Sequence, residues 1–182
     1  MAFLLTPPAN GQGAWTETVL HNFGFVTGKG DGAEPFEAMV AGPKGVLFGV
    51  TAVGGTSGYG TVYELVPPTT KGNAWTESVL YSFGTTSGGI YPSSGVILTS
   101  TGVLYGTLGN QITGGAGAIY KLAPPAVLGD PWTETALEVF TSNAGPGPGE
   151  PQGRLLLRKG ALYGTSVFGG ANGTGTVFKL IP

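Results

Sequence analysis

The feature that most constrains the fold of this chain is an internal repeat with a period of 57 to 60 residues. A Trp-Thr-Glu segment begins at Trp15 and recurs at Trp75 and Trp132. Two more motif sets keep the same order and period: an aromatic-Gly pair at residues 48–49, 105–106 and 163–164, and an apolar run ending in proline at residues 3–8, 63–68, 120–125 and 178–182. Because several motifs share one period, the chain consists of copies of one unit.

Each unit contains four short β-type segments separated by turn residues. Around the middle unit these segments are residues 77–83, 95–100, 103–108 and 118–122. Thr101-Gly102 predicts a tight hairpin, and Lys44-Gly45 and Lys159-Gly160 stand at the same place in the other units. Proline cannot donate to a strand ladder, so the Pro-Pro pairs end the third segment. The pattern predicts an all-β fold with four strands per repeat.

The period and length fit a β-propeller or a β-trefoil within a single domain over residues 1–182, and the offset of the segments is the one by which propellers close their rings. If the segment before the tight hairpin opens each unit, the repeats cover approximately residues 37–93, 94–151 and 152–182. The last unit then lacks a fourth strand, which residues 15–23 resemble. Propellers usually have 4–8 blades, so three blades predict a homodimer of six. A monomeric β-trefoil, which also has three four-stranded repeats, is the alternative.

Four motifs in this order resemble a known bacterial repeat. They are Leu-Tyr-Gly-Thr at residues 162–165, Gly-Thr-Val-Phe-Lys-Leu at 175–180, Glu-Ser-Val-Leu-Tyr-Ser-Phe at 77–83 and Asp-Gly-Ala-Glu-Pro at 31–35. Together they are similar to the GloVer-type (choice-of-anchor) tandem repeat over nearly the whole chain, with a strand order that resembles the NHL-type blade. The resemblance implies a propeller and a bacterial, exported protein, but it implies no reaction and no catalytic residue.

Composition excludes several classes of function. Charged residues make up 10% of the chain and the net charge is −2, against a usual charged fraction of ~25%, so no basic face for nucleic acid is expected. The absence of cysteine excludes disulfides and thiolate catalysis. No apolar run reaches ~20 residues and residues 1–8 have no basic region, so neither a membrane span nor a signal peptide is expected in this chain. Its localisation stays unassigned.

The repeated tryptophans give the first candidate ligand site. Each is followed two residues later by a glutamate, which gives the set Trp15, Trp75, Trp132, Glu17, Glu77 and Glu134. A tryptophan at one place in every unit is most simply explained by packing between blades. The functional hypothesis is a sugar-stacking platform with nearby polar groups, as in small lectin propellers.

The densest acidic cluster gives a candidate calcium site. Asp31, Glu34 and Glu37 lie before the first inner strand, and Asn143 and Glu150 occupy the matching region of the third unit. In a propeller these connections surround one mouth of the channel, where converging oxygens could provide the 6–8 ligands that calcium takes. A solvated loop is the alternative explanation, because no EF-hand spacing is present.

His21 is the only histidine and the only candidate general base. It stands where the other units have Tyr81 and Glu138, so we expect a solvent-facing or rim position. No nucleophile elbow, P-loop, dinucleotide fingerprint or HExxH motif occurs.

The leading functional prediction is therefore a ligand-binding, carbohydrate-binding oligomeric propeller without a catalytic motif. Its expected partners are a second copy of the chain and a small molecule or glycan, with no nucleic acid and no membrane. The alternative is a calcium-dependent hydrolase of the lactonase type, in which the metal at the channel mouth acts as a Lewis acid. A third reading is a structural, filament-forming repeat.

Overall fold

The computed structural model describes residues 1–24, 30–70, 72–85, 89–109, 115–140 and 147–182. Its regular structure in these residues is β-strand, apart from one three-residue 3-10 turn, η1 (Pro43–Gly45). Within the same residues, no helix is long and apolar enough to cross a membrane. The predicted all-β class is confirmed.

The strands form four small antiparallel sheets, and within each sheet a strand pairs with its neighbour in the chain. A hairpin comes first, then two four-stranded sheets, then a sheet with three strands. The strands are β1 (Ala2–Thr6) and β2 (Thr16–His21); β3 (Gly32–Ala41), β4 (Leu47–Gly54), β5 (Thr61–Val66) and β6 (Thr76–Ser82); β7 (Ile97–Leu98), β8 (Leu104–Leu108), β9 (Ala118–Ala123) and β10 (Thr133–Val139); β11 (Gly149–Arg158), β12 (Ala161–Phe168) and β13 (Thr176–Leu180).

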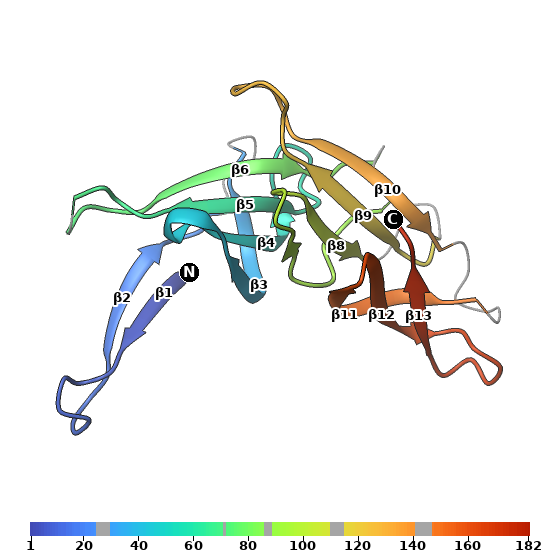
Figure 1. The fold of residues 1–182 in the computed structure, drawn as a ribbon, viewed down its shortest axis with the longest axis horizontal. Coiled ribbons are helices and arrows are strands. Elements are labelled where there is room, and N and C mark those ends of the chain that lie inside the picture. The colour runs from blue at the N-terminus through green and yellow to red at the C-terminus, as the bar shows by residue number, and fades with distance from the viewer. Residues whose placement is uncertain (25–29, 71, 86–88, 110–114, 141–146) are drawn as a thin grey trace.

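The sheets follow one another in an arc, with the β1–β2 hairpin at one end and the β11–β13 sheet at the other (Figure 1). They do not close into a barrel, so the propeller and the trefoil stay predictions. Residues 15–23 were expected to complete the third sheet of a second copy. Within this chain β2 is paired with β1 over five register positions, and such a completion would therefore require β1 to leave β2.

In each of the three larger sheets, one aromatic side chain lies over a glycine on the neighbouring strand. Gly49 is paired with Tyr63, Gly106 with Tyr120 and Gly164 with Phe178. A Cβ atom on any of these glycines would overlap the ring opposite. The aromatic-Gly motif of the sequence therefore exists because the ring needs the space that a side chain would fill.

The same aromatic contact joins every pair of successive sheets. Ring centroids are 4.8 Å apart for Phe23 and Tyr63, 5.0 Å for Phe83 and Tyr120, and 5.8 Å for Phe140 and Phe178. In each pair the first residue follows the last strand of one sheet, and the second belongs to the third-strand position of the next. The hydrophobic core is accordingly divided into three clusters that lie between neighbouring sheets.

Candidate functional site

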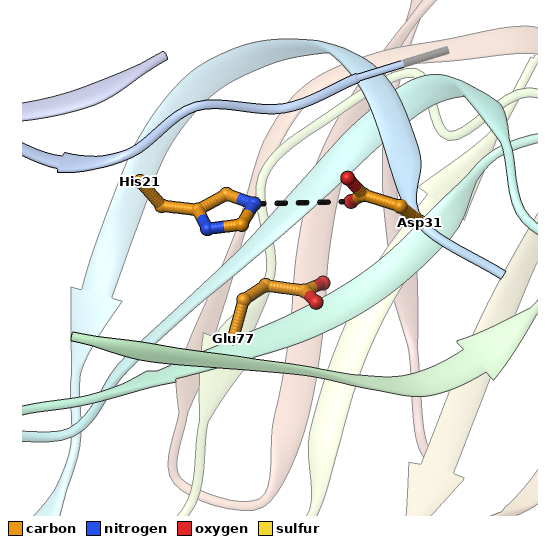
Figure 2. Close-up of side chains that lie close together, drawn as sticks. All are labelled: His21, Asp31 and Glu77. Atoms are coloured by element: carbon orange, nitrogen blue, oxygen red, sulfur yellow. Dashed lines mark ion pairs between the residues drawn. The ribbon is translucent and has the colours of Figure 1, made fainter. Parts of the chain in front are cut away.

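The candidate site lies at the junction of the N-terminal hairpin and the first four-stranded sheet. It brings together His21, Asp31 and Glu77, whose side chains point toward one another (Figure 2). His21 ends β2, Asp31 directly precedes β3, and Glu77 is the second residue of β6. The end of β2, the residue before β3 and the start of β6 therefore each contribute one side chain.

Local contacts hold each side chain in place. The imidazole of His21 packs edge-on against Phe23 at 4.6 Å, and Phe23 packs in turn on Tyr63. The backbone N–H of Gly24 donates to Asp31 Oδ2 at 3.2 Å. This hydrogen bond fixes the carboxylate and leaves Oδ1 directed at the site.

The three donor atoms converge without satisfying one another. His21 Nε2 lies 3.9 Å from Asp31 Oδ1, which exceeds hydrogen-bond length. One ligand atom from each of the three residues lies within 4.8 Å of the other two. His21 Nε2, Asp31 Oδ1 and Glu77 Oε1 are buried, and none has a hydrogen-bond partner among the described residues. Because buried polar atoms are normally paired, this convergent unpaired set is a candidate site for a bound cation.

The electrostatics of the site disfavour two unpaired carboxylates. Burial, followed by the charge of Asp31, raises the pKa of Glu77 to about 7. Burial and the charge of Glu77 also raise the pKa of Tyr63 to about 12. A cation between the carboxylates would offset the charge repulsion that adds to burial in raising the pKa of Glu77.

The structure combines residues that the sequence assigned to three different roles. His21 was the candidate base, Asp31 belonged to the calcium set, and Glu77 belonged to the tryptophan–glutamate set. His21 was expected at a solvent-facing or rim position, and its side chain is 21% exposed, because the hairpin lies against the first sheet.

One sequence signal could have identified this cluster: departure from the repeat. His21 stands where the other units have Tyr81 and Glu138. Asp31 stands four residues before a shared proline, where the other units have glycine at positions 88 and 147.

The remaining calcium candidates lie elsewhere. Glu34 and Glu37 are exposed on β3, and Glu150 is half-buried on β11. The group of three potential metal ligands that the described residues form contains none of them. Asn143 lies outside the described residues. The calcium site proposed from Asp31, Glu34, Glu37 and Glu150 thus stays a prediction.

The tryptophans differ in their surroundings. Trp75 packs against the core cluster between the hairpin and the first sheet, and Trp132 against the cluster between the first and second sheets. Trp132 also lines an open groove of about 520 Å³ at that second junction. Trp15 is exposed, as is Glu17, whereas Glu134 is half-buried. Packing accounts for Trp75 and Trp132, and sugar binding at the set stays a prediction.

The Gloeobacter/Verrucomicrobia repeat family matches residues 2–182 of this chain. No curated protein and no solved structure matches it.

Proposed function

This chain belongs to the Gloeobacter/Verrucomicrobia repeat family, and within that repeat architecture we propose that it is a binding module for a divalent metal ion, held by His21, Asp31 and Glu77. The observation that carries the proposal is the convergence of three buried donor atoms that lack hydrogen-bond partners in the described part of the chain. The ion is the ligand of the module, and no catalytic step is assigned to it.

The spacing of the donors suits a shared ion. A separation of 3.9 Å between His21 Nε2 and Asp31 Oδ1 is too long for a direct hydrogen bond. An ion at the usual ~2.0–2.2 Å from each atom would bridge this separation with a ligand–metal–ligand angle wider than tetrahedral. Glu77 supplies the third ligand from β6. The ion would neutralise the two carboxylates, which favours the charged form of Glu77 against the burial and the Asp31 charge that raise its pKa.

The donor set favours zinc or manganese over calcium. One imidazole nitrogen with two carboxylate oxygens is a borderline set of the kind that zinc and similar divalent ions accept. Calcium takes ~6–8 oxygens and rarely uses imidazole. The side chains of His21 and Asp31 are 21% and 27% exposed, although their donor atoms are buried.

Such an ion would join the hairpin to the first sheet. Its ligands come from β2, from the segment before β3, and from β6. Since the unfolded chain does not hold these three residues together, binding free energy would appear as added stability of this junction.

The solitary histidine makes a direct test possible. The untagged chain, freed of metal with a chelator, is titrated with Zn²⁺, Mn²⁺ and Ca²⁺ by calorimetry, and the imidazole of His21 is followed by ¹H–¹⁵N NMR during the Zn²⁺ titration. We expect one Zn²⁺ site per chain, a shifted Nε2 resonance, and no comparable heat with Ca²⁺. An unmoved imidazole signal at saturating Zn²⁺ would refute the site.

A matched pair of variants separates ligation from charge. Glu77→Gln should weaken Zn²⁺ affinity at least tenfold. Glu134→Gln changes the equivalent glutamate of the second sheet, where Tyr81 replaces the histidine, and should leave the affinity unchanged. Equal losses in both variants would indicate a nonspecific effect of surface charge and contradict the assignment.

A further inference from the structure

The two ends of the arc expose positions that are buried in the middle of the chain. Val62 and Ile119 are 0% and 1% exposed, but Val177, at the same register position of the third sheet, is 81% exposed. Val62 belongs to the core cluster between the first and second sheets, and Ile119 to the cluster between the second and third. In each case the residue packs on the sheet that follows.

The corresponding face of the third sheet is open and basic. Leu156 and Tyr163 lie there with Arg158 and Lys159 around an open groove of about 400 Å³. In the first two sheets the equivalents of Tyr163, which are Phe48 and Tyr105, are buried in the cores between sheets.

The hairpin exposes the face that, in the first sheet, packs on the preceding unit. Phe3 and Leu5 are 44% and 48% exposed, whereas their equivalents in the first sheet, Tyr63 and Leu65, are 2% and 0% exposed. Tyr63 and Leu65 pack on the unit that precedes them. The hairpin therefore presents the face that normally receives a preceding sheet, with Glu17 paired across from Leu5.

The charges of the two ends are complementary. Residues 147–182 contain four Lys or Arg and one Glu, which gives a net charge of +3, whereas residues 1–24, which contain the hairpin, have one Glu and no Lys or Arg, which gives −1 with His21 neutral. Complementary charge of this kind favours a head-to-tail encounter over contact between like ends.

We infer that these two faces bind each other between copies of the chain, with the hairpin of one copy packed on the β11–β13 sheet of the next. The contact would repeat the sheet-to-sheet packing already present three times within each chain. It is heterologous, because different surfaces meet, and it produces closed rings or longer assemblies according to the rotation between copies.

The first test is the mass of the untagged chain by light scattering across a concentration series, with chelator present so that the outcome does not depend on the metal site. We expect a mass of at least twice 18.3 kDa that falls as salt is added. Val177→Glu should give a folded monomer. Val127→Glu, on an exposed loop away from this face, should associate as the original chain does. A monomer at 0.1 mM overturns the inference.

A mixing experiment tests the head-to-tail arrangement itself. Leu5→Glu blocks the hairpin face and Val177→Glu blocks the third sheet, so each variant alone should be monomeric. An equimolar mixture retains one intact face of each kind and should form a heterodimer. Association of either variant with itself would overturn the arrangement, as would a mixture that stays monomeric although both variants keep the circular dichroism of the original chain.

Discussion

At the scale of single residues, the second sheet contains a buried polar pair that is not satisfied. Tyr120 OH and Glu134 Oε1 are buried and have no hydrogen-bond partner in the part of the chain that the structure describes. Burial raises the pKa of Glu134, and burial together with the charge of Glu134 raises the pKa of Tyr120. In the third sheet Phe178 replaces the tyrosine and removes the hydroxyl.

We therefore expect Glu134→Gln to stabilise the protein at neutral pH. The pKa of Glu134 is higher in the folded chain than its ordinary 4.5, so the folded state binds the proton more tightly. The associated stability is complete below about pH 4.5 and is lost as the pH rises through the folded-state pKa. Denaturant unfolding between pH 4 and 8 should show a smaller decline for the variant than for the original chain.

The control for this measurement is Glu17→Gln, because Glu17 occupies the same place in the exposed hairpin. Its pH profile should follow that of the original chain. A Glu134→Gln profile parallel to the original would show that ionisation of this carboxyl does not limit stability.

At the scale of strands and sheets, the glycine beneath each aromatic ring is the position where we expect a substitution to reduce stability most. Gly106→Ala would place a methyl group against the ring of Tyr120, which is fully buried and cannot move aside. Overpacking of this kind costs about 1–3 kcal/mol, and we expect a loss near the upper end, measured by denaturant unfolding.

Gly147→Ala provides the comparison. No atom lies within 4 Å of its added Cβ, and its φ is outside the left-handed region, so the change should stay within ~0.5 kcal/mol. A similar loss for both variants would mean that glycine-specific backbone effects, and not the ring, determine the result.

At this scale the repeat predicted that the chain is all-β, but it did not predict where several strands begin. β3 starts at Gly32 and β11 at Gly149, several residues before the segments that the apolar pattern marked as inner strands. Both strands contain a register irregularity, with Glu37 and Gly153 at φ of 62° and 79°. A bulge lets strand pairing continue beyond the point where the alternation of apolar and polar residues breaks. The repeat period therefore cannot reveal the longer strand.

The candidate site was predictable only in part for a related reason. The residues were identified individually, but their meeting depends on packing of the hairpin against the first sheet through Phe23 and Tyr63. Residues 21, 31 and 77 are brought together by a contact between two sheets. The residue pattern of a strand predicts only which strands and faces pair within a single sheet.

At the scale of the whole molecule, stability should be graded along the arc. Each sheet packs on its sequence neighbours, as in other quasi-one-dimensional repeat proteins. We expect hydrogen exchange to be slowest in β8 and β9, which are buried between sheets, and fastest in the β1–β2 hairpin.

Addition of Zn²⁺ should then slow exchange in the hairpin and at the start of β6 more than in β8 and β9. Exchange is measured by mass spectrometry below the concentration at which chains associate, with Glu77→Gln as the control that should not respond. Uniform protection across the four sheets would show that the chain unfolds as a single cooperative unit.

Whether the successive sheets close into a ring is also a property of the whole molecule, and the repeat pattern did not determine it. A ring forms only when the rotation from each sheet to the next adds up to a full turn. That rotation results from many small packing adjustments at junctions such as Phe83 with Tyr120, and the motifs are compatible with more than one value.

The recurrence of one aromatic contact at every junction has an evolutionary consequence. Duplication or deletion of a 57-residue segment would add or remove a sheet and leave each remaining junction with the same pair of faces. Recombination can therefore lengthen or shorten the gene without creating a new kind of junction between sheets. Differences between junctions arise instead from point changes, and His21 and Asp31 are two such changes at the first junction.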